Sequence, residues 1–255
     1  MESQSTISDY SKYGKYTVDD TLTLKIPNCI LTLTKISANK YRYSKDSDSN
    51  TTELLTTEKS ILEIELAPIL PITLPSKKSK YIMFNFNDKI YVDANSKSNI
   101  YVQFPLEIGL FIIGSNDSRR LLDSFTLDPE NSRFGLYGNP DNGIFCNHFD
   151  VKTESSGKIQ SIPYRQGILK ITMHNPLDHE IVVGTLVFLV SNHTMYYVNN
   201  STHVDDLTFT IKQDAGMNSF AKISSVPLEC QNGWSVSPQI SDKTDTPFVM
   251  CEGFD

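Results

Sequence analysis

The amino-acid sequence predicts an all-β protein built as an antiparallel β-sandwich. Only five of the 255 residues are alanine, the best helix former, whereas β-branched and aromatic residues, which prefer pleated and half-buried surfaces, are plentiful. Short runs of alternating apolar and polar residues also recur at close spacing, each bounded by turn residues. Together these observations argue against a helical bundle and against an α/β enzyme.

The first alternating run covers residues 21–26, where leucine and isoleucine alternate with threonine and lysine before a Pro-Asn turn. The next run covers residues 62–66, and its alternation predicts that Glu63 and Glu65 lie on the solvent face. Several prolines follow closely. Because proline lacks the donor of a strand ladder, they indicate a strand edge or a crossover.

Further strands are predicted in the first half of the chain. Residues 82–86 alternate, and the Asn-Asp pair at residues 87–88 predicts a hairpin turn into a strand at residues 90–92. Residues 100–104 repeat the alternation. Residues 109–113 are almost continuously apolar, as in a buried strand.

The second half of the chain has the same pattern. Residues 125–127 form a short apolar run that ends at an Asp-Pro pair, and residues 207–211 form a late strand. Between them, residues 168–190 predict two paired strands joined by an Asn-Pro turn. This unit is immunoglobulin-like in style, which is a similarity of architecture and carries no function.

Composition suggests a division of the chain into four parts. We expect a flexible N-terminal tail at residues 1–11, a first β-sandwich half at residues 12–114, a second half at residues 115–230 and a C-terminal tail at residues 231–255. A single elongated body of packed sheets is the alternative. The tail holds the only tryptophan, Trp234, which would either dock on the body or anchor a partner.

The net charge of −7 excludes the electrostatic signature of a general nucleic-acid binder, so no nucleic-acid partner is expected. Arg119 and Arg120 form one of two basic clusters, which we interpret as solvated loop charge rather than as an anion site. The polar first 14 residues contain no secretory signal, and the longest apolar stretch is too short to span a membrane. Four scattered cysteines without a CxxC pair fit free thiols and a cytoplasmic location.

Two segments carry a family resemblance. Residues 101–109 read YVQFPLEIG, and residues 137–146 read YGNPDNGIFC. Their order and spacing resemble an archaeal family, common in methanogens, that is known only as a domain of unknown function. The resemblance covers residues 12–230 and implies no catalytic or binding residue. Relatives are expected to have a basic residue after the cysteine, where this chain has Asn147.

The run of residues 146–150 contains a candidate metal site. On a strand, Cys146, His148 and Asp150 share one face, and thiolate, imidazole and carboxylate are all metal ligands. His174 or His179 could supply a further ligand from a neighbouring hairpin. Two other interpretations stay open: a cysteine–histidine nucleophile pair, and an ordinary strand with one buried face.

A turn-rich segment at residues 137–143 is a candidate binding loop. Glycine and asparagine permit positive φ, and asparagine and aspartate bond to their own backbone, so a tight hairpin also explains the composition. The candidate residues of this loop are Tyr137, Gly138, Asn139, Asp141, Asn142 and Gly143.

No Walker A, GxGxxG, GxSxG or kinase motif is present in the sequence. We therefore expect a non-enzymatic, soluble β-sandwich protein that binds a protein partner, a second copy of itself or a small ligand through its loops. The alternative is a metal-binding protein or metal-dependent enzyme centred on Cys146, His148 and Asp150. Carbohydrate binding on an aromatic sheet face is a third hypothesis. The sequence identifies no cofactor, ligand or partner.

Overall fold

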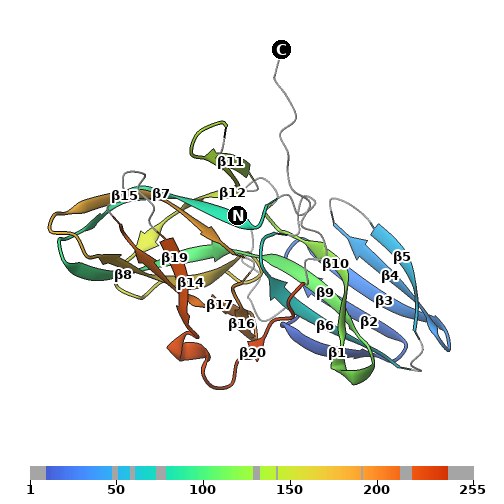
Figure 1. Ribbon diagram of the computed structural model, residues 1–255. Helices are drawn as coiled ribbons and strands as arrows, with labels where there is room; N and C mark the ends of the chain where they lie inside the picture. The colour runs from blue at the N-terminus through green and yellow to red at the C-terminus, as the bar shows by residue number, and fades with distance from the viewer. Residues whose placement is uncertain are drawn as a thin grey trace, which may run out of the picture.

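The computed structural model describes residues 10–47, 51–57, 61–72, 79–128, 133–141, 143–190, 192–212 and 220–240 (Figure 1). Strands make up nearly all of the regular structure. In the first half of the chain they are β1 (Gly14–Val18), β2 (Thr21–Ile26), β3 (Cys29–Ser37), β4 (Lys40–Asp46), β5 (Thr51–Thr56), β6 (Leu62–Ile69), β7 (Tyr81–Val92), β8 (Ser96–Pro105), β9 (Glu107–Ile113) and β10 (Arg119–Phe125).

The second half contributes shorter strands and two single 3-10 turns. The strands are β11 (Arg133–Tyr137), β12 (Ile144–Val151), β13 (Thr153–Glu154), β14 (Gln166–Asn175), β15 (Ile181–Leu189), β16 (Met195–Val198), β17 (Ser201–Val204), β18 (Asp206–Thr210), β19 (Phe220–Ser225) and β20 (Ser235–Val236). The 3-10 turns are η2 (Ser115–Asp117) and η4 (Leu228–Cys230). No helix in the described ranges is long and apolar enough to cross a membrane.

In the described part of the chain the strands form four sheets. The meander has the order β2-β3-β4-β5, and the β9 sheet has the order β1-β6-β9-β10. The β7 sheet has the order β11-β12-β7-β15, and the β8 sheet runs β13-β8-β14-β17-β16-β20 with β18 and β19 beside it. Most pairs are antiparallel, and β12 pairs with β7 in parallel. The all-β, sandwich-like fold predicted from the sequence is confirmed.

Aromatic packing joins the β7 sheet to the β8 sheet. The ring of Phe84 in β7 lies 6.0 Å from that of Phe104 in β8 and 5.3 Å from that of Phe188 in β15, both edge to face. Phe84 and Phe104 are fully buried. Alternation explains these strands, because every second residue of β14 is buried, while all of β9 is buried as its continuous apolar run predicts.

Two local predictions about turns are wrong. Residues 87–88 form no hairpin turn, because β7 continues through them and pairs with β15 on both sides. The pairing register shifts between Val183 and Thr185, so a bulge accommodates the polar residues. Residues 168–190 do not form paired strands either, since β14 pairs with β8 and β15 pairs with β7.

Asn175 explains why the chain crosses between sheets after β14. Its buried side-chain amide donates hydrogen bonds to the carbonyl oxygens of Val92 at 3.0 Å and His179 at 2.9 Å, and Oδ1 accepts one from Leu177 N. These bonds fasten the turn after β14 to the turn between β7 and β8. Both connections therefore pass from one sheet to the other, as arches rather than hairpins.

The expected solvent face of β6 is wrong for Glu65. Glu63 is exposed, but Glu65 is only 2% exposed because β16 packs over this part of β6. Glu65 accepts a hydrogen bond from Tyr197 Oη at 2.8 Å and another from Arg119 Nε at 3.0 Å. Arg119 is therefore anchored to the buried Glu65, although Arg119 and Arg120 are both exposed residues.

The division of the chain at residues 114/115 stays a prediction. Five strand pairs of the described residues cross this boundary: β9 with β10, β7 with β12 and with β15, and β8 with β13 and with β14. At the C-terminal end, β20 pairs with β16, and Trp234 docks edge to face on His203 with ring centroids 5.0 Å apart. Most of the expected tails, residues 1–9 and 241–255, lie outside the described residues.

Candidate ligand-binding site

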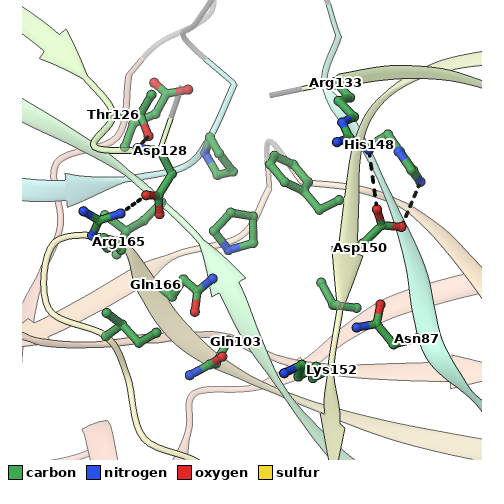
Figure 2. A pocket seen from close by; sticks show the side chains of 17 residues that line it. Asn87, Gln103, Thr126, Asp128, Arg133, His148, Asp150, Lys152, Arg165 and Gln166 are labelled. Carbon is green, nitrogen blue, oxygen red and sulfur yellow. Dashed lines mark hydrogen bonds and ion pairs between the residues drawn. The ribbon is translucent and has the colours of Figure 1, made fainter. Parts of the chain in front are cut away.

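A cavity of about 330 Å³ opens where three sheets meet. The β7 sheet contributes residues from β7, β11 and β12, and the β8 sheet contributes residues from β8 and β14. The β9 sheet contributes the first residue of β9 and residues next to β9 and β10. Figure 2 shows that polar side chains from these elements surround the cavity. The volume is at the small end of the range for ligand pockets in proteins.

One wall of the cavity carries an ion pair between Asp128 and Arg165. Arg165 Nη1 donates to Asp128 Oδ1, and the two residues are separated by 37 positions in the chain. Thr126 Oγ1 accepts a hydrogen bond from the backbone N–H of Asp128 at 3.2 Å, which orients the carboxylate. Both charged side chains are partly exposed, 36% for Arg165 and 22% for Asp128, so a ligand in the cavity could reach them.

The opposite wall in Figure 2 centres on Asp150. Asn85 Nδ2 donates a hydrogen bond to its Oδ1 at 2.8 Å, and His148 Nε2 lies 3.8 Å from the same oxygen. Arg133 Nη1 lies 3.8 Å from Oδ2. The carboxylate thus accepts a hydrogen bond from β7 and lies near basic side chains of β11 and β12.

A strained turn presents Arg165 and Gln166. Tyr164 has φ of 65°, in the left-handed region that a bulky residue adopts only under constraint. The turn is closed by hydrogen bonds from Ile162 N to Gln166 O at 3.0 Å and from Gln166 N to Ile162 O at 2.9 Å. Leu106 N then donates to Arg165 O at 3.2 Å, which ties the turn to the chain beside β8.

The aromatic ring of Tyr164 anchors this strained turn in the core. The residue is 1% exposed, and its ring centroid lies 5.3 Å from that of Tyr13 and 6.3 Å from that of Tyr10. Its hydroxyl donates to the carbonyl oxygen of Ser11. Strain of this kind persists only where the surroundings impose it, and it often accompanies binding sites.

A glycine–alanine comparison at Tyr164 measures the strain. Both Tyr164→Gly and Tyr164→Ala lose the buried ring, but only alanine retains the cost of positive φ. We expect Tyr164→Gly to be more stable than Tyr164→Ala by about 1 kcal/mol, the reverse of the usual order. Urea unfolding of both variants gives the difference. Equal stability, or a more stable alanine variant, would contradict the assigned strain.

The structure separates the three predicted metal ligands. His148 and Asp150 line the cavity, whereas Cys146 is fully buried and its Sγ lies 3.3 Å from the carbonyl oxygen of Ile144. Burial raises the pKa of the Cys146 thiol to about 12, which disfavours the thiolate that a metal requires. Across the described ranges, no three His, Cys, Asp or Glu side chains are grouped to hold a metal ion. The metal site stays a prediction.

The predicted binding loop forms the tip of the β11–β12 hairpin. Asn139 Oδ1 accepts a hydrogen bond from Asp141 N at 2.8 Å, and Gly138 has φ of 101°, as turn chemistry predicts. Gly143 is required by close approach, since a Cβ there would lie 2.7 Å from Asn139 O. Asn142 lies outside the described residues. The described residues of this tip do not line the cavity, so ligand binding by the loop stays a prediction.

Asn147, where relatives are expected to have a basic residue, has a structural role. Its buried amide donates to the carbonyl oxygens of Pro71 at 3.3 Å and Ser79 at 3.2 Å, which holds the chain that precedes β7 against β12. The next residue in sequence, His148, lines the cavity, whereas Asn147 does not.

Sequence reasoning missed the cavity residues of the other wall. Asp128, Arg165 and Gln166 belong to no motif, and they meet only because β8 and β10 end where β14 begins. The one local signal was the Asp-Pro pair that ends the strand at residue 127. From the sequence alone, Asp128 cannot be distinguished from an ordinary turn residue, because its partner Arg165 is distant in the chain.

Comparison with known proteins yields a family but no close relative. Searches of curated proteins and of solved structures found no match to the chain. The family described as "Protein of unknown function (DUF432)" matches residues 12–242, which include every strand of the structure and the whole cavity. The chain therefore belongs to the DUF432 family, whose function is unknown.

Proposed function

We propose that this protein is a binding protein that holds a small polar molecule in the cavity between its three sheets. The observation that carries the proposal is the arrangement of the two charged walls around a small cavity. Asp128 and Arg165 lie on one wall and His148 and Asp150 on the other, and all four are partly accessible. Such a site can orient a polar ligand by hydrogen bonds at both ends.

The way in which these side chains are held supports the proposal. His148 and Asp150 are part of a strand, and Arg165 follows a turn that is strained and closed by backbone hydrogen bonds. Rigid support of this kind lowers the entropy lost when a ligand binds. Gln166 adds an acceptor, because its Oε1 is buried without a hydrogen-bond partner among the described residues. A ligand that donates a hydrogen bond to this buried acceptor lowers the free energy of the complex.

A thermal-shift screen of the full chain tests the proposal. The compounds are neutral sugars, amino acids, hydroxy acids and sugar phosphates. We expect at least one class to raise Tm, and we expect Gln166→Met to weaken its binding about tenfold by removing the amide at nearly constant volume. Gln231→Met, a change at an exposed position away from the cavity, serves as the control.

Two outcomes would contradict ligand binding in the cavity. One is a screen in which no compound raises Tm. The other is a compound whose affinity is the same in Gln166→Met as in the unmodified chain, since that compound binds elsewhere.

A protein partner or a second copy of the chain is a further proposal. The β11–β12 hairpin exposes Leu136, Tyr137 and Ile144, by 40%, 44% and 38%, and β11 is the last strand of its sheet in the described ranges. Exposed apolar residues on an edge strand favour strand addition. The alternative, a metal-binding protein centred on Cys146, His148 and Asp150, is tested by elemental analysis of the purified protein. A near-stoichiometric metal would support it.

We further propose a cellular setting from the cysteines, the charge and the sequence motifs of the chain. Cys29, Cys146 and Cys230 are free and buried, which fits a cytoplasmic location. The acidic net charge supports a partner other than nucleic acid. The two motifs at residues 101–109 and 137–146 support an archaeal origin.

A further inference from the structure

The carboxylates that line the cavity are already engaged. Asp128 forms an ion pair with Arg165. Asp150 accepts a hydrogen bond from Asn85, and the side chains of His148 and Arg133 lie 3.8 Å from its carboxylate oxygens. The third carboxylate, Glu107, is 3% exposed and is not free. Each of these carboxylates therefore already interacts with a group of the fold, although Glu107 Oε2 itself has no hydrogen-bond partner among the described residues.

Lys152 differs from these groups because it is exposed at the cavity and has no ionic or hydrogen-bond partner among the described residues. It follows β12, immediately after the buried Val151. Figure 2 shows its side chain at the cavity, on the same side of the view as Asn87 and Gln103. A lysine at this position can accept an anionic group without breaking a bond of the fold.

Arg165 adds a second site for an anion. Among the described residues only its Nη1 is engaged by a side chain, through Asp128, and the other guanidinium donors remain available. A guanidinium has five donors, so one ion pair leaves capacity for a further carboxylate or phosphate oxygen.

Three side-chain amides line the same cavity as these cations. Gln103, Gln166 and Asn87 all line the cavity, and Gln103 Nε2 donates to the carbonyl oxygen of Gln160 at 3.1 Å, which fixes its orientation. An amide donates and accepts hydrogen bonds, as a hydroxyl does, so a group of amides suits a ligand with several hydroxyls.

We infer that the ligand is a small hydroxylated organic anion, whose carboxylate or phosphate pairs with Lys152 and whose hydroxyls bond to the amides of Gln103 and Gln166. This inference rests on the proposed function and names the chemical class of its ligand. The cavity of about 330 Å³ limits the ligand to a small molecule.

Matched probes test the ligand class by calorimetry. D-glucuronate and D-glucose share the pyranose ring and differ by a carboxylate at C6, and glucose 6-phosphate carries a phosphate there instead. We expect one of the two anions to bind at least about tenfold more tightly than glucose, with an affinity that falls as salt is added. The anion that binds more tightly identifies which head group the site prefers.

The variant Lys152→Gln should remove this preference and leave the Tm of the unliganded protein unchanged. Lys158→Gln changes an exposed lysine away from the cavity and should keep the preference. The inference is overturned if glucose binds as tightly as both anions, if Lys152→Gln keeps the preference, or if none of the three probes binds. The proposed function is judged separately, because a neutral compound whose binding depends on Gln166 would support the cavity while excluding the anion.

Discussion

Replacing Arg119 by alanine is expected to destabilise the protein by about 3 kcal/mol, the lower end of the range for breaking a buried ion pair. The loss leaves the carboxylate of Glu65 inside the fold with Tyr197 Oη as its remaining donor, at a position that is 2% exposed. The lower end applies because the Arg119 side chain is itself 27% exposed. For a chain of this size, Tm should fall by about 10 °C.

A neighbouring arginine provides the control for this prediction. Arg120→Ala changes an exposed side chain and should alter stability by less than about 0.5 kcal/mol. The double variant Glu65→Gln/Arg119→Ala should recover part of the loss, because the neutral amide still accepts from Tyr197 and no charge is buried. Urea unfolding of the unmodified chain and of the three variants measures these differences in stability. If Arg119→Ala and Arg120→Ala are equally stable, the ion pair does not contribute as argued.

Acid should destabilise the protein through His193. This residue is 1% exposed, its Nδ1 has no hydrogen-bond partner within the described residues, and burial lowers its pKa from 6.5 to about 4. Between pH 6.5 and pH 4 the unfolded chain therefore binds a proton that the folded chain does not. Stability from this residue is complete above pH 6.5 and falls with decreasing pH, by about 3 kcal/mol at pH 4.

The difference between two unfolding curves isolates this contribution. His193→Phe cannot bind the proton, so the stability of the variant relative to the unmodified chain should rise as the pH falls from 6.5 to 4. His179→Gln, a change on a half-exposed turn, should not reproduce that trend. A constant difference between His193→Phe and the unmodified chain over this range would mean that His193 becomes protonated in the folded state as readily as in the unfolded state.

Alternation in the sequence predicts strands well but not what covers them. The alternating run at residues 169–173 lies in β14, and the continuous apolar run at residues 109–113 lies in β9, because the apolar side chains of a strand must be buried whatever its neighbours are. Glu65 shows the limit of this reasoning. Its face of β6 is polar by pattern, yet β16 packs against it from a distant part of the chain. No local pattern contains that information.

Turns show the same limit. The Asn-Pro turn after β14 has the composition of a hairpin, but the side chain of Asn175 bonds to Val92, so the connection crosses between sheets. The difference depends on a residue more than 80 positions away in sequence. The candidate site was predictable only in part for the same reason. His148 and Asp150 share one strand face and were identified, whereas Asp128 and Arg165 meet only in the folded chain.

The anchor of Tyr164 also determines when the cavity can become functional during folding. The hydroxyl of Tyr164 bonds to Ser11, a contact between residues 153 positions apart, and Tyr13 N donates to Asn199 O at 2.9 Å. Contacts of such high sequence separation require closure of a long loop, which slows their formation. During synthesis, Ser11 is made long before its partner Tyr164. The turn that carries Arg165 is therefore not held in place until the strands near residue 200 have been synthesised and have paired. The ability to bind ligand should thus arise late in folding. Its appearance would show that the strands of all three sheets around the cavity have assembled, rather than any single sheet.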